Sequence, residues 1–571
     1  MDMSVKEKFN AWLDYDLEDK DLKEELLSIK DDENEIYERF YTDLKFGTAG
    51  LRGVIGAGIN RMNIYTVRRA TQGIAIYLKK MYENPSVAVS YDSRNKSELF
   101  AKETAKTFAA NGIKVHIYKE LMPTPNLSFA VRELDCKAGV MVTASHNPAK
   151  YNGYKAYGAD GCQLSTKPSE DILEIVTKLD IFTDVKTIDF DEALKTGMIN
   201  YIPDEVTEKF YNHVLSQRIN PDVVKDADLH VVYTPLNGTG NKPVREILKR
   251  MGVTRVDLVE EQVNPDGNFT TCPYPNPEIK EALALGLKKC EETGADLLLA
   301  TDPDADRVGI AVKKDDSYVL LTGNEVGVLM LDYIAKSRIQ NGTMPKDPVT
   351  VKTIVTTKLI ESVAKEYGVK VINILTGFKY IGEQIGLLEE KGEENRYIMG
   401  FEESYGYLTG TYVRDKDAVN ASLMICEMAA YYKKNGLTLY QALENLYKKH
   451  GRYLNSQDNI GFEGAAGMKK MQEIMSSLRE NPPKTLGGLE VVRISDYEDS
   501  TTRDLKNGTM TEIFLPKADV LIFDLEKDNQ VVVRPSGTEP KIKVYYTAKA
   551  DDLDGAKALT EKLSKDVKEK F

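Results

Sequence analysis

The sequence predicts an α/β protein of several domains, and three observations support this fold class. The chain has 571 residues, which is too long for one hydrophobic core and favours about three to four domains. Short apolar runs that resemble strands alternate with longer segments of helical periodicity, as in largely parallel α/β sheets. The C-terminal part instead carries closely spaced strand-like runs, which predict an α+β domain with antiparallel strands.

The predicted elements begin with a helical segment. Residues 1–45 are highly charged and have apolar residues at helical spacing, which predicts surface helices. Strands and helices then alternate over residues 87–142, and the same alternation returns over 229–300 and 349–400. Each of these three segments is predicted to form one α/β unit.

The last predicted unit has four strand-like runs between residues 485 and 548, followed by an amphipathic helix over 552–571. Domain boundaries are expected near residues 204, 323 and 452. The sequence therefore predicts four domains, which cover residues 1–203, 204–322, 323–451 and 452–571.

Composition excludes several classes of protein. The formal net charge of −13 argues against a nucleic-acid partner, because such proteins usually present a basic face. No uninterrupted apolar stretch is long enough to span a membrane, and the N-terminus has no apolar signal region. The five cysteines are scattered and odd in number, which is typical of reduced thiols in a cytoplasm.

Four predicted strands end in polar loops marked by Gly or Pro. In open α/β sheets, ligands bind beyond the carboxyl ends of the strands, so these loops are the candidate site. One loop comes from each predicted domain, and we expect all four to face a single cleft. They read TASHNP from residue 143, TDPDADR from 301, GFEES from 400 and RPSGTEP from 534.

The TASHNP loop places Ser145 beside His146. A serine hydrolase is disfavoured because no G-x-S-x-G motif is present. Adjacent side chains usually point apart, so His146 is expected to be badly placed as a base for Ser145. The alternative is an ordinary turn, since Ser, Asn and Pro are turn-forming residues. Ser145 is therefore a poor candidate for an acyl nucleophile.

The DPDADR loop carries Asp302, Asp304 and Asp306 at alternate positions, so that three carboxylates converge on one point. This oxygen-rich set suits a hard cation, and Mg²⁺ leaves positions open for phosphate oxygens. An EF-hand is excluded, because its required Gly and Glu are replaced by Arg307 and Lys313. The alternative is a solvated acidic turn, although clustered anions without a cation would repel one another.

Two further loops suit a phosphorylated sugar. In RPSGTEP, Arg534 is placed to grip a phosphate while Ser536, Thr538 and the turn around Gly537 donate hydrogen bonds. A plain β-hairpin turn is the alternative. GFEESYG offers carboxylates beside a hydroxyl, which suits sugar hydroxyls; its alternative is a charged helix N-terminus.

Together, a hydroxyl nucleophile, an Mg²⁺ cluster and a phosphate-binding loop describe phosphoryl transfer on a sugar phosphate. No P-loop and no kinase signature is present, which disfavours ATP as the donor. The phosphoryl group is then expected to come from the protein itself, with Ser145 as a phosphoserine.

With these loops, the chain resembles the α-D-phosphohexomutase superfamily, and specifically its phosphoglucomutase branch. Seven motifs in the family's order carry the resemblance: GTAGLRG (47–53), TASHNPAKYNGYK (143–155), DPDADR (302–307), LTGFK (375–379), GFEESYG (400–406), RDKD (414–417) and RPSGTEPK (534–541). The resemblance implies four domains around a central cleft, three with a shared mixed α/β core and a smaller α+β fourth domain.

The resemblance also implies a mechanism and a set of site residues. Phosphorylated Ser145 would give its phosphoryl group to a sugar monophosphate, and the bound bisphosphate would turn over before returning a phosphoryl group from its other end. Glucose 1,6-bisphosphate would prime the serine, and Ser145 would hold Mg²⁺ together with Asp302, Asp304 and Asp306. Lys155 is expected to be the general acid/base, with His146 as its orienting partner and Arg52 and Arg307 stabilising charge. The implied substrate-binding residues are Thr376, Lys379, Glu402, Ser404, Arg414, Lys416, Arg534, Ser536, Gly537 and Thr538.

Substrate preference depends on one loop. Glu403 favours glucose over mannose, so interconversion of glucose 1-phosphate and glucose 6-phosphate is the leading expectation. Phe401 stands where the glucose branch commonly has Gly, and this form also resembles a subgroup that includes pentose-phosphate mutases. Phosphopentomutase and phosphomannomutase therefore stay open, as do a sugar-bisphosphate synthase and a non-catalytic sugar-phosphate-binding protein.

Overall fold

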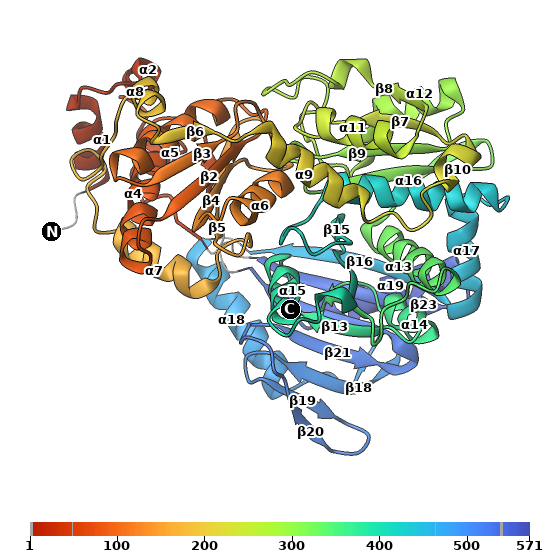
Figure 1. Cartoon of the computed structure of the whole chain (residues 1–571). Helices are drawn as coiled ribbons and strands as arrows, with labels where there is room; N and C mark the ends of the chain where they lie inside the picture. Colours follow the sequence, from red (N-terminus) through yellow and green to blue (C-terminus); the bar gives the residue numbers. More distant parts are fainter. Residues whose placement is uncertain (1–3, 48–49, 463, 537–540) are drawn as a thin grey trace. The chain divides into compact units, whose positions relative to one another are not determined.

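The chain folds into two compact units, each built from two separate stretches of sequence. The computed structural model describes residues 4–47, 50–462, 464–536 and 541–571. The first unit contains Met1–Gly323 and Phe378–Thr438, and the second contains Asn324–Gly377 and Leu439–Phe571 (Figure 1). The predicted domain boundaries near residues 204, 323 and 452 stay predictions.

A mixed six-stranded sheet forms the N-terminal part of the first unit, in the order β1-β5-β4-β2-β3-β6 (Figure 1). The four strands β4, β2, β3 and β6 run parallel, as the sequence pattern predicted, while β5 and β1 join antiparallel. The strands are β1 (Gly50–Val54), β2 (Ser86–Tyr91), β3 (Lys114–Ile117), β4 (Ala138–Val142), β5 (Tyr151–Gly158) and β6 (Ile199–Tyr201). The helices of this region are α4 (Ile64–Met81), α5 (Ser97–Ala110), α6 (Thr124–Glu133), α7 (Thr166–Val176) and α8 (Phe190–Lys195).

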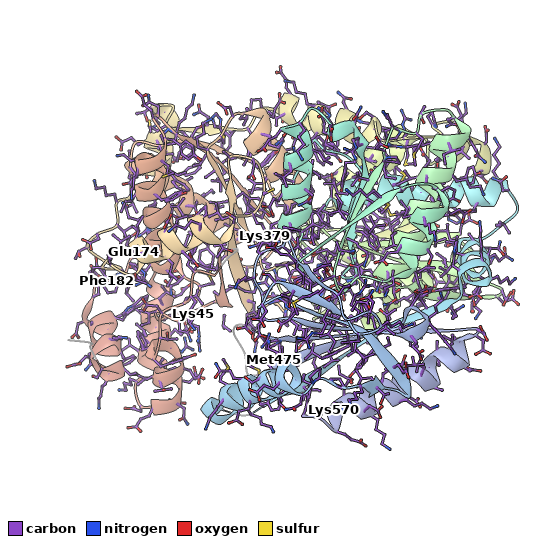
Figure 2. All side chains as sticks on the ribbon, turned by 90° about the horizontal axis from the view of Figure 1, so that it is seen from below. Lys45, Glu174, Phe182, Lys379, Met475 and Lys570 are labelled. Atoms are coloured by element: carbon purple, nitrogen blue, oxygen red, sulfur yellow. The ribbon has the colours of Figure 1, made fainter. Side chains whose placement is uncertain are left out.

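Three helices precede this sheet, which confirms the helical prediction for residues 1–45: α1 (Val5–Asp14), α2 (Lys20–Ser28) and α3 (Glu33–Phe40). Ser4 and Glu7 form a capping box that starts α1. Trp12 is buried, and its ring packs edge-on against Tyr65 of α4 at 5.5 Å between centroids. Phe182, which is labelled in Figure 2, stacks on Tyr15 with 3.9 Å between the ring centroids. These aromatic contacts attach the charged N-terminal helices to the sheet domain.

A five-stranded sheet follows in the order β11-β10-β9-β7-β8. The central strands β7 and β9 are wholly buried, in line with their continuous apolar sequence, and they pair in parallel. The strands are β7 (His230–Thr234), β8 (Arg255–Leu258), β9 (Leu297–Thr301), β10 (Val308–Lys314) and β11 (Ser317–Leu321). The helices are α9 (Asp204–Leu215), α10 (Val223–Ala227), α11 (Asn241–Met251) and α12 (Ala284–Thr293), with short 3-10 turns at η1 (Glu260–Gln262) and η2 (Lys280–Leu283).

The second stretch of the first unit adds a hairpin and two longer helices. Asp417 caps the N-terminus of α16 by accepting hydrogen bonds from Val419 and Asn420 N–H groups, each at 2.9 Å. The α16 helix is buried along almost its whole length, in line with its mostly apolar sequence. The elements are α15 (Lys379–Glu389), η3 (Glu394–Arg396), β14 (Tyr397–Glu402), β15 (Gly406–Leu408) and α16 (Ala418–Lys434).

The second unit contains the antiparallel sheet that the C-terminal sequence predicted, in the order β16-β23-β22-β21-β18-β19-β20 with β17 on β18. Met475 of α18, labelled in Figure 2, lies in the core of this sheet. The strands are β16 (Arg452–Gly461), β17 (Thr485–Leu486), β18 (Leu489–Asp496), β19 (Thr501–Asp504), β20 (Met510–Glu512), β21 (Leu521–Leu525), β22 (Gln530–Pro535) and β23 (Lys541–Ala550). The helices are α17 (Leu439–His450), α18 (Gly464–Glu480) and α19 (Leu553–Lys568), with the 3-10 turn η4 (Glu526–Asp528).

The earlier stretch of the second unit holds the parallel pair β12 (Val349–Thr353) and β13 (Lys370–Ile374). The helices α13 (Gly323–Gln340) and α14 (Leu359–Glu366) belong to this stretch.

The state of the cysteines and the length of the helices both bear on the class of protein. All five cysteines are buried free thiols, so they serve as small core residues. Among the described residues, no helix combines the length and the apolarity that crossing a membrane requires.

Candidate active site

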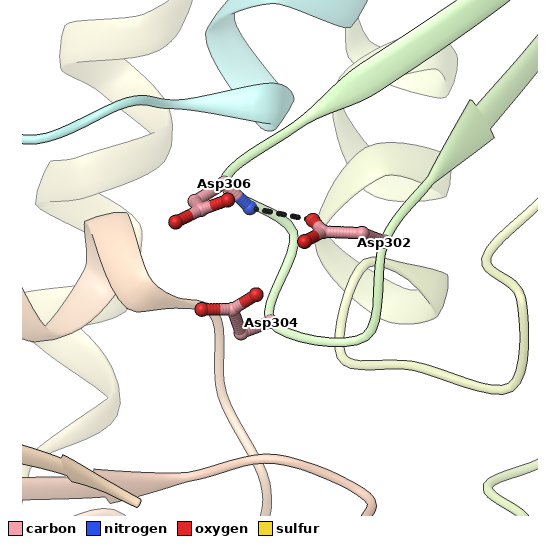
Figure 3. Close-up of side chains that lie close together, drawn as sticks. All are labelled: Asp302, Asp304 and Asp306. Carbon is pink, nitrogen blue, oxygen red and sulfur yellow. Dashed lines mark hydrogen bonds between the residues drawn. The ribbon is translucent and has the colours of Figure 1, made fainter. Parts of the chain in front are cut away.

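Three buried carboxylates meet in the loop between β9 and β10. Asp302 and Asp304 are fully buried, Asp306 is 2% exposed, and their oxygens lie within 4.8 Å of one another (Figure 3). The predicted convergence of the DPDADR carboxylates is confirmed. A solvated acidic turn is excluded, because these side chains do not reach solvent.

The loop backbone holds this arrangement. Asp302 Oδ1 accepts hydrogen bonds from the N–H of Asp306 at 3.1 Å, drawn in Figure 3, and from the N–H of Arg307 at 3.0 Å. Oδ1 of Asp304 and Oδ1 of Asp306 are buried and accept no hydrogen bond. Buried carboxylate oxygens without partners are costly unless a ligand satisfies them, so this donor set fits a hard divalent cation such as Mg²⁺.

Ser145 faces this cluster from the end of β4. Its Oγ donates a hydrogen bond to Asp302 Oδ2 at 2.8 Å, and the residue is 3% exposed. Its φ of 53° is left-handed, a conformation that costs about 1–3 kcal/mol for a residue other than glycine. Close backbone packing supports the loop: a Cβ on Gly153 would lie 2.4 Å from the Thr143 carbonyl oxygen. Two motifs more than 150 residues apart in sequence therefore share one site.

The expected separation of Ser145 and His146 is wrong. His146 Nδ1 lies 3.2 Å from Ser145 Oγ, within hydrogen-bond distance. The left-handed turn at Ser145 rotates the chain so that neighbouring side chains meet instead of diverging. Burial, together with the positive charges of Arg307 and Arg52, lowers the pKa of His146 to about 3. His146 is therefore neutral at physiological pH and too weak a base to ionise a serine.

Two lysines neutralise part of the cluster. Lys155 Nζ lies 2.6 Å from Asp304 Oδ2 and 3.2 Å from Asp306 Oδ2. Lys416 Nζ lies 3.3 Å from Asp306 Oδ2 and 3.2 Å from Asp415 Oδ1. The structure thus brings Lys416 of the RDKD motif to the carboxylates, as well as the expected Lys155.

The protonation states follow from this charge pattern. Burial and the neighbouring carboxylates of Asp304 and Asp306 raise the pKa of Asp302 well above its usual range. Burial acts the same way on Asp306, but the ammonium groups of Lys155 and Lys416 overcome it and lower the pKa of Asp306. Burial alone would lower the pKa of Lys155, yet Asp304 and Asp306 raise it. Lys155 is therefore an ammonium, which suits a proton donor.

The two expected arginines occupy different environments. Arg307 Nη1 donates to Glu278 Oε1 at 2.6 Å, and its Nε is 3.9 Å from Asp306 Oδ1. Arg52 lies on β1, opposite Gly153 of β5, and its side chain is exposed. Arg307 is thus fixed beside the carboxylates, whereas Arg52 is accessible to a ligand. Thr48 and Ala49 of the same motif lie outside the described residues.

The GFEES loop is a turn between β14 and β15, not a helix N-terminus, so that alternative is wrong. Glu402 pairs with Gly406 across this hairpin, and Tyr405 takes a left-handed φ of 64°. The Val308 N–H donates to the Tyr405 carbonyl at 3.1 Å, so the GFEES loop adjoins the strand that leaves the aspartate loop. Burial raises the pKa of Glu402 to about 7, although Lys416 opposes the shift. Ser404 lies half-buried in the same turn.

Two other predicted contacts of the first unit are placed by helix α15. Lys379 begins this helix and is half-buried, with Nζ 5.2 Å from the Tyr380 ring centroid. Arg414 is 1% exposed and donates through Nη2 to Glu389 Oε2 of α15 at 2.7 Å. Its guanidinium also donates to the carbonyls of Thr411 and Val413. These contacts fix the RDKD loop that presents Lys416.

The remaining predicted substrate residues belong to the second unit. Thr376 follows β13, and Arg534 lies on β22. The Ser536 N–H donates to the Lys541 carbonyl at 2.8 Å as the chain passes from β22 to β23, which is the strand connection that the hairpin alternative predicted. Gly537 and Thr538 lie outside the described residues. Convergence of this loop with the other three stays a prediction.

Sequence reasoning missed Thr124, the first residue of α6. Its Oγ donates to Asp304 Oδ2 at 2.8 Å, and its N–H donates to the Asp304 carbonyl at 2.9 Å. The MPTPN stretch that contains it had a usable signal, because a Pro in the first helical turn marks a helix start whose N–H groups favour anions.

Comparison with known proteins agrees with this geometry. Four phosphoglucomutase/phosphomannomutase family models match in order: alpha/beta/alpha domain I over residues 43–181, domain II over 208–315, domain III over 322–450 and the C-terminal domain over 515–562. A phosphoglucomutase of Staphylococcus aureus (strain MRSA252) is 38% identical over 521 residues, covering 90% of this chain and 92% of that protein. A phosphoglucomutase of Staphylococcus haemolyticus is 36% identical over 517 residues, with coverages of 90% and 92%.

Solved structures share the fold. The open form of the Paramecium phosphoglucomutase pp63/parafusin matches with a TM-score of 0.70 at 18% identity, covering 93% of this chain and 95% of that one. A phosphoglucomutase/phosphomannomutase family protein of Burkholderia thailandensis matches with a TM-score of 0.64 at 17% identity, with coverages of 91% and 96%. The chain belongs to the phosphoglucomutase/phosphomannomutase family of the α-D-phosphohexomutase superfamily, whose members are sugar-phosphate mutases.

Proposed function

We propose that this protein is a phosphoglucomutase that interconverts glucose 1-phosphate and glucose 6-phosphate through a phosphoserine at Ser145. The observation that carries the proposal is the 2.8 Å hydrogen bond from Ser145 Oγ to Asp302, inside a buried cluster of three aspartates. A serine so placed is a nucleophile at the edge of a cation site, which suits phosphoryl transfer better than acyl transfer. The curated relatives named phosphoglucomutase support glucose as the substrate.

Mg²⁺ is the proposed cofactor. Asp302, Asp304 and Asp306 would hold it together with the phosphoserine, and the unpartnered oxygens of Asp304 and Asp306 support this assignment. The cation would offset the roughly two negative charges of a phosphoserine and polarise the transferring group.

The proposed reaction moves one phosphoryl group and one proton. The bond between Ser145 Oγ and phosphorus breaks, a bond forms from phosphorus to a sugar hydroxyl oxygen, and the hydroxyl proton is passed on so that Ser145 Oγ regains its hydrogen. Lys155 is the proposed proton carrier. Its position against two carboxylates keeps it an ammonium, and weakening of those contacts would release it to act as a base. His146, neutral and 3.2 Å from Oγ, would orient the serine.

Glucose 1,6-bisphosphate is the proposed intermediate and priming activator. Glu402 and Ser404 would bind ring hydroxyls, while Arg414 would act by holding the loop of Lys416. Arg52, Arg307, Thr376, Lys379, Arg534, Ser536, Gly537 and Thr538 complete the proposed contacts with phosphate and sugar. The five buried free thiols support a reducing cytoplasmic compartment.

Intact-mass measurement tests the proposal directly. The expected result is one phosphate on Ser145 after treatment with glucose 1,6-bisphosphate, lost on addition of sugar monophosphate and absent from Ser145→Ala. A protein that binds the sugar phosphate but never exchanges a phosphate would be a non-catalytic binding protein, and the proposal would fail.

Two relatives on the same scaffold remain alternatives, a phosphomannomutase and a phosphopentomutase. The Phe401 position favours keeping the pentose alternative, and Glu403 argues for glucose. Values of kcat/KM for glucose, mannose, glucosamine and ribose 1-phosphates separate them. Net accumulation of bisphosphate without mutase turnover would indicate a sugar-bisphosphate synthase.

A further inference from the structure

Two buried side chains that follow β2 contact the loop that carries Ser145. Asp92 and Arg94 come from the sequence YDSR, and both side chains are completely shielded from solvent. Neither belongs to the site residues described above. A guanidinium and a carboxylate buried so deeply must be satisfied by hydrogen bonds, so their partners show what they do.

Arg94 binds the carbonyl groups of the Ser145 loop. Its Nη1 donates to the carbonyls of Pro148 at 3.0 Å and Tyr151 at 3.1 Å, and its Nη2 donates to those of Ser145 and Asn147. One planar side chain thus holds four carbonyls within seven consecutive residues. Arginine suits this arrangement because its guanidinium offers five N–H donors in a rigid plane.

Asp92 holds the other side of Ser145. Its Oδ2 accepts from Thr143 Oγ1 at 2.6 Å, and Thr143 Oγ1 in turn accepts from the Ser145 N–H at 2.8 Å. Asp92 Oδ2 also lies 3.3 Å from Arg94 Nε. The N–H and the carbonyl of Ser145 are therefore both connected to this one buried ion pair, which maintains the left-handed backbone that directs Oγ to Asp302.

A ring from a distant part of the sequence covers Arg94. The guanidinium carbon is 5.0 Å from the centroid of the Phe269 ring, and Phe269 is fully buried. This cation–π contact places an apolar ring over the guanidinium, and a low-polarity surrounding strengthens the hydrogen bonds that the guanidinium donates. The cover comes from a loop between β8 and β9, so the 204–322 segment helps to fix the serine of the 1–203 segment.

We propose that Arg94 is a positioning residue for the phosphoryl-transfer step, acting by holding Ser145 Oγ against Asp302. The inference rests on the proposed function, since it concerns the phosphoserine reaction. Displacing the loop by about 1 Å is expected to slow phosphoryl transfer by about 100-fold, because a misplacement of that size costs that much in other enzymes. Substrate binding elsewhere in the site is expected to change little.

Arg94→Lys is the test variant, because lysine keeps the charge but reaches fewer of the carbonyls at once. Arg68→Lys is the matched control. Arg68 is also a buried arginine of the same sheet domain, with its side chain 5% exposed, but it binds Glu18 and Glu103 instead of the serine loop. The measurement is loss of phosphate from Ser145 after mixing with glucose 1-phosphate, followed by rapid quenching and intact mass, with steady-state KM and melting temperature.

The expected result is a transfer rate about 100-fold lower in Arg94→Lys with KM within about twofold of wild type. Arg68→Lys is expected to melt earlier but transfer at nearly the wild-type rate. Wild-type transfer by Arg94→Lys, or an equal loss in Arg68→Lys, would overturn the inference. If Arg94→Lys does not fold, Phe269→Leu decides in its place: a drop of about tenfold in kcat with unchanged KM supports the inference, and wild-type kcat overturns it. A wild-type protein with no exchangeable phosphate would instead refute the proposed function.

Discussion

Replacing Asp417 with asparagine is expected to make the stability of the first unit less sensitive to pH. Asp417 is fully buried at the N-terminus of α16 and accepts hydrogen bonds from Val419, Asn420 and the Tyr412 hydroxyl, the last at 2.8 Å. Burial raises its pKa from 3.8 to about 6, even though these hydrogen bonds oppose the shift. Asparagine can accept the same two backbone bonds and carries no charge.

The size of the effect follows from linkage. The shift from 3.8 to about 6 corresponds to about 3 kcal/mol, since each pKa unit is worth about 1.4 kcal/mol. The folded state holds the proton more tightly than the unfolded state, so unfolding free energy is lost as pH rises from about 4 through 6. About 1.4 kcal/mol of that loss falls between pH 5 and pH 7.5. The unfolding free energy of Asp417→Asn does not include this loss. The difference in unfolding free energy between Asp417→Asn and wild type should therefore shift by about 1.4 kcal/mol in favour of the variant between pH 5 and pH 7.5.

Urea unfolding of both proteins at several pH values measures the difference between their stabilities. Comparing the two proteins at each pH cancels the contributions to stability of the other titrating groups, which both proteins share. Tyr412→Phe is the matched control, because removing the hydroxyl bond to Asp417 should raise the carboxyl pKa further and enlarge the loss on going to neutral pH. A stability difference between Asp417→Asn and wild type that stays constant from pH 5 to 7.5 would refute the reasoning.

Three further predictions concern the site. Lys155→Ala should lower kcat by about 100-fold or more, because general acid–base catalysis typically contributes that much; near wild-type turnover across pH would remove Lys155 from this role. Asp304→Asn should raise the Mg²⁺ concentration for half-maximal activity by more than about tenfold, since even the loss of an outer partner of a metal site costs that much, and chelation should abolish activity. Glu402 has a pKa of about 7, so kcat/KM for glucose 1-phosphate should rise as pH increases through 7, because the ionised carboxylate accepts stronger hydrogen bonds from sugar hydroxyls. Glu402→Gln should flatten this profile.

The prediction for the metal site has a control variant in the RDKD loop. Asp415→Asn leaves the three aspartates intact while altering a neighbour of Lys416, so it should keep the metal requirement of wild type. A similar rise in that requirement would show that the whole cluster, and not a metal ligand, was disturbed. An unaltered pH profile in Glu402→Gln would place the titration on another group.

Much of the site was predictable because its information is local. The alternate aspartates of DPDADR converge in any tight turn, and the buried strand before them predicts that the turn starts at a sheet edge. The strands β2, β4, β7 and β9 were predicted for the same reason, since their apolar runs are continuous and bounded by polar loops.

The contacts that could not be predicted depend on backbone conformation or on distant partners. Nothing in TASHNP indicates that Ser145 has a φ of 53°, and this angle alone reverses the expected orientation of His146. Lys416 meets Asp306 across 110 residues of sequence, which no periodicity encodes. Asp92 and Arg94 had the same signal as the recognised loops, polar residues directly after a buried strand, but their role depends on carbonyls that begin about fifty residues later.

The discontinuous sequence of the first unit has a consequence for biosynthesis. Its second stretch, Phe378–Thr438, carries Lys416 and Glu402, and it is made after Asn324–Gly377 of the other unit. A growing chain that ends at residue 323 has the serine, the three aspartates and Lys155, but it lacks Lys416, the second ammonium group beside Asp306. Asp306 therefore gains its second ammonium partner only after residue 416 has emerged from the ribosome, so this part of the site is completed late in synthesis.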